Sequence, residues 1–190
     1  MTDVQQTRIL ALVGMPGAGK TMCATYLEER GYYQFRFGSI VTDEVERRGL
    51  DINPVNERNI RLELRQKGGM DVMAKRALPK LRTALETYQT IVIDGLYSFS
   101  EYKTLHAEFP NSMVVVAIAA PRHLRYQRLA MRPHRPLTPD EARTRDWQEI
   151  QTMEKGGPIA IADYTLVNSS TQTDLTVQLQ TLLTSLKMLP

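Results

Sequence analysis

The sequence predicts an α/β fold in which helices cover both faces of a five-stranded parallel sheet. Two patterns carry this prediction. Short apolar runs of strand length alternate along the chain with longer segments of helical periodicity, and such alternation is typical of a parallel sheet with crossover helices. The first apolar run also leads through a glycine-rich loop into a helical pattern. At 190 residues, the chain is expected to form one domain with a substantial core.

Continuous apolar runs and short aromatic alternations mark the strands, because strands covered on both faces have no polar side. The predicted strands are 8–13, 32–37, 91–93, 113–118 and 164–167. The predicted helices are about 19–30, 39–48, 54–67, 71–87 and 98–109, one opened by Pro121, 138–153, and a last one carrying Leu175 to Leu186.

Capping residues and helix breakers predict where the helices begin and end. Gly31 suits the end of the first helix. Pro79 predicts a kink or an interruption in its helix, and the sequence 156–158, Gly-Gly-Pro, predicts a turn. The expected helix starts are Ser39 as an N-cap, Asn53-Pro54, the capping box of Ser98 with Glu101, and the capping box of Thr138 with Glu141.

The glycine-rich loop fits the phosphate-binding pattern G-x-x-x-x-G-K-[ST] and has the strand–loop–helix context that the pattern requires. In such a loop, backbone N–H groups turn inward around an anion. Lys20 would reach the β- and γ-phosphates, and the Thr21 hydroxyl would bind Mg²⁺. The sequence therefore predicts a P-loop NTPase fold with ATP and Mg²⁺ as cofactors, in preference to a turn that binds nothing. The predicted nucleotide contacts are Gly14, Met15, Pro16, Gly17, Ala18, Gly19, Lys20, Thr21 and Met22.

A carboxylate follows the third predicted strand. Asp94 would lie at the carboxyl end of this buried run, where open α/β sheets bind their ligands. It is therefore a second candidate ligand for Mg²⁺, beside Thr21. The alternative is a turn-forming role before Gly95.

Two polar segments without strands are expected to lie outside the core. The core is predicted as 1–37, 88–131 and 157–190, with an acceptor-binding insert at about 38–87 and a lid at about 132–156. Phosphoryl transfer needs positive charge on the transferring group. The candidate lid arginines are Arg128, Arg132 and Arg135, with Arg145 a weaker candidate; the alternative is a solvated charged face. In the insert, Arg58, Arg61 and Arg65 share one helix face, where an ordinary Glu57–Arg61 surface ion pair is the competing interpretation.

The bulk composition excludes several classes of function. The net charge is only +3, so nucleic-acid binding is not expected although the arginine clusters leave it open. Cys23 is the only cysteine, which rules out a disulfide framework, and no histidine has zinc-ligand spacing. No stretch has the length of a membrane span, so we expect a cytoplasmic protein, either a monomer or a homodimer.

Taken together, these motifs resemble the P-loop kinases of small molecules, the group of nucleoside monophosphate kinases and dephospho-CoA kinases. The resemblance is closest to an archaeal-type, adenylate-kinase-related family that is also dephospho-CoA-kinase-like. It implies a core sheet, a helical acceptor-binding insert and a closing lid, and it implies that Asn168 lies near the adenine base. The segments that carry it are 14–20, 43–50, 64–65, 74–76, 94–95, 128–129, 145–146 and 162–168.

The sequence departs from adenylate kinases where they bind the acceptor phosphate. Ser39 and Thr42 stand where those enzymes have an aspartate and an arginine, and Tyr97 stands in the segment where they carry a second arginine. Either the insert arginines replace them, or the acceptor is not an ordinary nucleoside monophosphate. Tyr97 could then stack on a base or line the acceptor pocket. The candidate acceptor-binding residues are Ser39, Thr42, Asp43, Arg58, Arg61, Arg65 and Tyr97.

The leading functional hypothesis is an ATP–Mg²⁺-dependent phosphotransferase acting on a nucleotide-like small molecule, similar to a nucleoside monophosphate kinase. A dephospho-CoA kinase-like enzyme or a kinase of nucleoside or modified-base hydroxyls is the alternative acceptor class; in that case Asp94 or Asp43 could orient the hydroxyl. A nucleotide-dependent switch or slow ATPase with a macromolecular partner is the alternative of another class.

Overall fold

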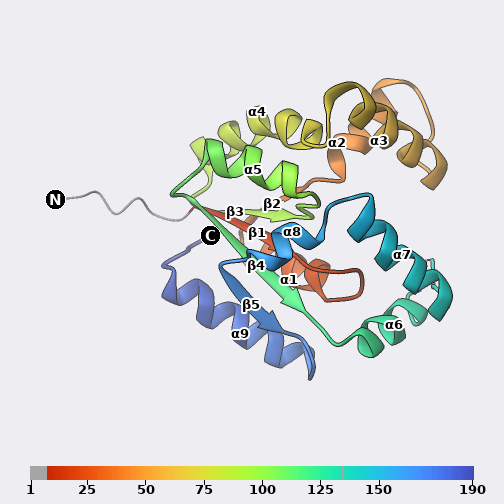
Figure 1. Cartoon of the computed structure of the whole chain (residues 1–190). Helices are drawn as coiled ribbons and strands as arrows, with labels where there is room; N and C mark the ends of the chain where they lie inside the picture. Colours follow the sequence, from red (N-terminus) through yellow and green to blue (C-terminus); the bar gives the residue numbers. More distant parts are fainter. Residues whose placement is uncertain (1–7, 134) are drawn as a thin grey trace.

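A computed structural model of the chain describes residues 8–133 and 135–190 (Figure 1). The first seven residues of the predicted core and His134 of the predicted lid lie outside the described residues. Within these two ranges, five parallel strands form one sheet in the order β2-β3-β1-β4-β5, which confirms the predicted fold class. The strands are β1 (Ile9–Val13), β2 (Tyr33–Arg36), β3 (Ile91–Asp94), β4 (Met113–Ala119) and β5 (Tyr164–Val167).

Helices pack on both faces of this sheet. Because successive side chains of a strand point to opposite faces, each strand contributes to the cores on both sides. Ile9, Ala11 and Val13 of β1 belong to the core under α2 to α5, whereas Leu10 and Leu12 belong to the core under α1 and α9. The helices are α1 (Lys20–Glu28), α2 (Ser39–Arg47), α3 (Pro54–Gly68), α4 (Val72–Thr87), α5 (Phe99–Glu108), α6 (Arg122–Ala130), α7 (Pro139–Gln151), α8 (Gly156–Ala160) and α9 (Gln172–Ser185).

The sheet places the ends of β1 and β3 side by side. Leu12 of β1 pairs with Asp94 of β3 on one side and with Val116 of β4 on the other. The helices that follow β1 and β3, α1 and α5, pack on opposite faces of the sheet. The two connections therefore diverge, which leaves a crevice at the carboxyl ends of these strands, the usual ligand-binding position in an open α/β sheet.

Two helical regions lie beyond the carboxyl ends of the strands. Figure 1 shows α2 and α3 at one end of the molecule and α6 with α7 across from them, with the loop after β1 between the two regions. α2 and α3 fall in the predicted insert and α7 in the predicted lid. Their assignment as insert and lid remains a prediction. In the part of the chain that the structure describes, no helix has the length and apolar character needed to cross a membrane.

The helix boundaries confirm some predictions and correct others. Both capping boxes form, and Asn53 caps α3. Ser39 was expected to be an N-cap, but it is the first residue of α2 and makes no capping hydrogen bond, because the helix already begins after Gly38. Pro79 does not interrupt α4.

The predicted turn at 156–158 is wrong, because these residues begin the short helix α8. Pro158 falls in the first turn of this helix, where a missing N–H costs nothing. Glycine at position 157 also lets the helix approach α5 closely: a Cβ there would lie 2.7 Å from the Cβ of Phe99. Gly-Gly-Pro thus permits a tight helix contact here rather than a turn.

Candidate active site

The glycine-rich loop joins β1 to α1 and is shaped by close contacts with other segments. Gly17 and Gly19 have φ values of +79° and +115°, which side chains other than glycine rarely adopt. A Cβ on Gly17 would lie 2.7 Å from the Arg125 carbonyl oxygen, and one on Gly19 would lie 2.4 Å from Nδ2 of Asn168. The loop therefore needs glycine at both positions for backbone conformation and for space.

A buried ion pair holds the loop from the side of α6 and α7. Arg125 donates to both carboxylate oxygens of Asp146, at 2.9 and 2.6 Å, and also donates to the Pro16 carbonyl at 2.9 Å. Both side chains of the pair are less than a tenth exposed. The tip of the loop is thus fixed to the helices that carry the candidate lid arginines.

Asn168, which follows β5, holds the loop from the opposite side. Its Nδ2 donates to the Ala18 carbonyl at 2.8 Å. Arg128 in turn donates to the carbonyl and the side-chain oxygen of Asn168, both at 3.1 Å. Asn168 therefore supports both the loop and a candidate lid arginine; its expected place near adenine remains a prediction.

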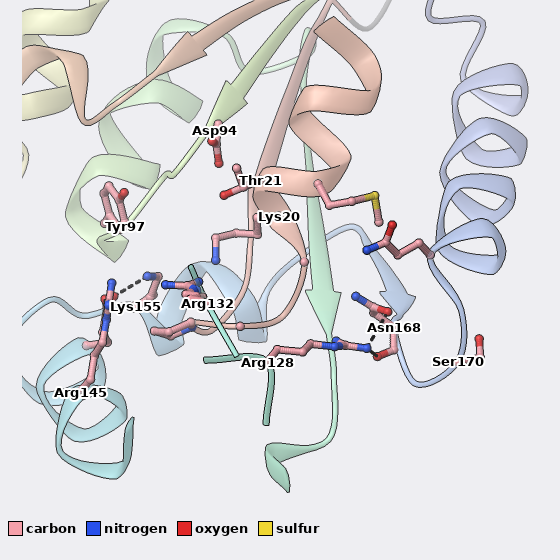
Figure 2. Close-up of a pocket in the computed structure, with 16 residues that line it drawn as sticks. Lys20, Thr21, Asp94, Tyr97, Arg128, Arg132, Arg145, Lys155, Asn168 and Ser170 are labelled. Carbon is pink, nitrogen blue, oxygen red and sulfur yellow. Dashed lines mark hydrogen bonds and ion pairs between the residues drawn. The ribbon is translucent and has the colours of Figure 1, made fainter. Parts of the chain in front are cut away.

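A cavity of about 610 Å³ opens in front of this loop (Figure 2). It brings together most of the predicted nucleotide, metal and lid residues. The predicted residues in its lining are Pro16, Gly17, Gly19, Lys20, Thr21, Met22, Asp94, Tyr97, Arg128, Arg132 and Asn168. Arg145, the weaker lid candidate, also lines it, and the lining is completed by Glu149, Lys155, Ser170 and Gln172, which sequence reasoning missed.

Lys20 lies at the centre of the cavity. Its ammonium donates to the Gly14 carbonyl at 2.7 Å and to the Met15 carbonyl at 3.3 Å. Burial, reinforced by the nearby charge of Lys155, lowers the pKa of Lys20 to about 7. An anion bound at the loop would stabilise the charged form of this lysine.

The Thr21 hydroxyl and the Asp94 carboxylate, the two predicted Mg²⁺ ligands, lie on the same side of the cavity (Figure 2). Burial raises the pKa of Asp94, while Lys20 and Arg36 oppose that rise. No group of three or more His, Cys, Asp and Glu side chains that could hold a metal occurs in 8–133 and 135–190. One hydroxyl and one carboxylate fit Mg²⁺, which usually takes few protein ligands and completes its shell with substrate phosphates and water.

The end of the cavity next to Tyr97 contains an ion-pair cluster from the lid region. Lys155 pairs with Glu149, and Arg145 lies 3.6 Å from the same carboxylate. The Lys155 ammonium also lies 4.7 Å from the centre of the Tyr97 ring. Lys155 is only 2% exposed, although a lysine before two glycines looks like a turn residue in the sequence. Only the tertiary structure identifies it as a site residue.

The remaining candidates lie outside the lining of this cavity. Arg65 forms a buried pair with Glu101 at 3.3 Å, whereas Arg58 is exposed on the same helix. Asp43 pairs with Lys80. The candidates that the structure does not bring to the cavity lining are Gly14, Met15, Ala18, Arg135, Ser39, Thr42, Asp43, Arg58, Arg61 and Arg65. Their suggested roles remain predictions.

Comparison with solved structures finds this fold in other proteins, two of which are kinases. The protein TT1252 from Thermus thermophilus has a TM-score of 0.67 at 18% identity, covering 95% of this chain and 98% of its own. The shikimate kinase from Bacteroides thetaiotaomicron has a TM-score of 0.63 at 14% identity, covering 95% and 99%. A sugar kinase from Janibacter has a TM-score of 0.52 at 18% identity, covering 94% and 95%. These likenesses establish the fold.

Sequence comparison establishes the family. The family model described as "AAA domain" matches residues 13–153. The UPF0200 protein TK1334 of Thermococcus kodakarensis is 35% identical over 177 residues, which cover 92% of this chain and 95% of the relative. A UPF0200 protein of Thermococcus gammatolerans is also 35% identical, covering 92% and 93%. The chain is therefore a member of the AAA-domain family of this model and of the UPF0200 family, with the fold of the small-molecule P-loop kinases that its sequence resembles.

Proposed function

We propose that the protein is an ATP–Mg²⁺-dependent phosphotransferase that acts on a nucleotide-like small molecule. The observation that carries the proposal is the arrangement of one cavity around Lys20. Asn168 and Ser170 line it on one side of this lysine, and Tyr97 with Lys155 line it on the other (Figure 2). A donor nucleotide on the first side would direct its terminal phosphate toward an acceptor on the second.

The chain's own groups would act mainly by positioning and by electrostatic stabilisation. Backbone N–H groups of the loop would bind the donor phosphates. Lys20 would contact the transferring group, and Arg132 and Arg145 would add positive charge from the lid region. Thr21 and Asp94 would hold Mg²⁺. When bound, this ion would neutralise phosphate charge and orient the reacting groups.

Two acceptor chemistries fit this cavity, and Asp94 has a different task in each. A phosphate acceptor requires little acid–base chemistry. A hydroxyl acceptor must lose a proton, and burial raises the pKa of Asp94, which makes its carboxylate a stronger base. Asp94 would then be the candidate group for accepting or orienting that proton.

The direct test is ADP formation from ATP and Mg²⁺, measured with a coupled assay across nucleoside monophosphates, nucleosides and dephospho-CoA. We expect at least one acceptor to stimulate ADP formation, and the Lys20→Ala variant to lose that stimulation. ATP hydrolysis that no acceptor in the panel changes would contradict the proposal and would favour a nucleotide-dependent switch or slow ATPase.

A further inference from the structure

We infer that the end of the cavity beside Tyr97 is an oxyanion-binding site built on Lys155 and Arg145, which takes an acidic group of the acceptor, a phosphate or a carboxylate. This inference deepens the proposed function and rests on it for the identity of the ligand as an acceptor. It places the recognition of the acceptor's charge on two residues of the lid region rather than on the insert arginines.

The first argument is the position of the Lys155 ammonium. A lysine that is 2% exposed is costly to bury unless its charge is compensated. Burial lowers the pKa of Lys155, while Glu149 opposes that change. An ammonium has three N–H donors, and the hydrogen bonds among the described residues use one of them, to Glu149. The group still lines the cavity, so it can donate to a ligand there.

The second argument is the charge of the cavity wall. Five cationic side chains line it, namely Lys20, Arg128, Arg132, Arg145 and Lys155, against the two carboxylates of Asp94 and Glu149, which leaves a net charge of +3. These cations are close enough to repel one another. The charge of Lys155 lowers the pKa of Lys20, an effect second only to that of burial. A Mg²⁺-bound triphosphate carries roughly two net negative charges. An anionic acceptor would bring the remaining positive charge closer to balance.

The third argument is that the buried insert arginine already has a partner. Arg65 pairs with Glu101, whose other carboxylate oxygen accepts the backbone N–H groups of Tyr97 and Ser98 at 3.0 and 2.9 Å. Removing Arg65 from this pair would leave a carboxylate uncompensated in the core. Arg65 thus helps to hold Tyr97 in place, whereas Lys155 and Arg145 face the cavity.

Equilibrium titration of anions into the full-length protein tests this site without turnover. The protein is first saturated with Mg²⁺ and a non-hydrolysable ATP analogue, so that the loop is filled, and is then titrated calorimetrically with inorganic phosphate or with acetate. A parallel titration uses the Lys20→Ala protein without nucleotide, which keeps the test valid if the analogue does not bind. We expect Lys155→Gln to weaken binding of the preferred anion at least about tenfold, since it removes a charge-assisted hydrogen bond.

Two further variants separate binding from folding. Lys155→Gln leaves Glu149 with only its longer contact to Arg145, at 3.6 Å, so the double variant Glu149→Gln with Lys155→Gln replaces the ion pair by neutral amides. It should keep the fold, judged by circular dichroism, and should bind the anion at least about tenfold more weakly than the Glu149→Gln single variant. The control is Lys75→Gln, an exposed lysine paired with Asp71 at 3.0 Å on α4, which should change the dissociation constant by less than about twofold.

Each outcome bears on the inference. Tighter binding of phosphate than of acetate would identify a phosphate group on the acceptor, and the reverse would identify a carboxylate. Anion binding that is the same in the wild type and in both Lys155 variants would overturn the inference, as would the absence of any anion binding. These results are distinct from failure of the proposed function, in which Lys155-dependent anion binding persists but no acceptor stimulates ADP formation.

Discussion

The two ends of the cavity are built in different ways. At the loop, the key contacts join side chains to backbone: Lys20 to Gly14, Arg125 to Pro16 and Asn168 to Ala18. At the Tyr97 end, charged side chains contact one another, as in the pairs of Glu149 with Lys155 and Arg145. A backbone-based site depends on a short contiguous motif, whereas a site of paired side chains depends on the tertiary structure. The four tests below probe this difference.

The largest effect is expected at the loop. Lys20→Ala should lower ATP-dependent turnover by about a hundredfold to a thousandfold, because it removes a preorganised charge from the transferring group. Steady-state ADP formation measures the loss. Lys75→Ala, the exposed control on α4, should retain nearly full activity. Turnover of Lys20→Ala within about tenfold of the wild type would show that other cavity cations can replace Lys20.

The next effect concerns the stability of the loop's support. Arg125→Ala should lower the free energy of unfolding by about 3–5 kcal/mol, because Asp146 would remain buried without its partner. Denaturant unfolding provides the measurement. The matched control, Arg82→Ala, breaks the more exposed pair of Arg82 with Glu108 and should cost less than about 1 kcal/mol. Equal losses in the two variants would argue against a special role for the buried pair.

The third effect is a change in proton binding. The pKa of Lys20 is about 7 before nucleotide binds, so at pH 8 this lysine is mostly neutral. Bound phosphate favours the ammonium and raises that pKa, so nucleotide binding at pH 8 should take up close to one proton. At pH 6 the lysine is already charged, and the uptake should fall toward zero. Calorimetry in buffers of different ionisation enthalpy measures this number.

Lys20→Gln is the control for that measurement, since it removes the titrating group. Proton uptake in this variant at pH 8, or equal uptake by the wild type at pH 6 and pH 8, would assign the proton to another residue.

The smallest effect is expected from the acidic member of the cluster at the Tyr97 end. Glu149→Gln should tighten phosphate binding to the nucleotide-saturated protein about threefold to tenfold, because it removes a negative charge beside the bound anion. The same calorimetric titration measures it, with the exposed Glu46→Gln as the control. Weaker binding in Glu149→Gln would show that Glu149 matters more for positioning Lys155 than for competing with the anion.

Local signals were enough to predict most of the fold. Each of the strands β1 to β5 is a short apolar or alternating run, and the loop is a contiguous motif. Both can therefore be predicted from the local sequence without knowledge of the tertiary structure. Predictions based on single residues were less secure. Ser39 has the chemistry of an N-cap, but α2 begins after Gly38. The glycines at 156–157 permit helix packing as readily as a turn.

The candidate site was predictable only where a contiguous motif or the end of a strand provides it. Lys20 and Thr21 follow β1 and Asp94 ends the neighbouring strand β3, so sheet topology brings them together. Tyr97 could be singled out because it stands in the segment where related kinases carry an arginine. Lys155 and Glu149 gave no such signal, because their role depends on how α7 and α8 pack beside Tyr97. The burial of the Arg65–Glu101 pair likewise depends on contacts between distant helices.

The contact of Asn168 with Ala18 spans 150 residues, and it has a consequence for biosynthesis. A growing polypeptide that has not yet released β5 from the ribosome contains the whole phosphate-binding motif but lacks the amide that supports it. Nucleotide binding can therefore stabilise the finished protein more than its early folding intermediates, because ligands stabilise only the states that bind them. ATP would then favour the completed chain at the end of synthesis.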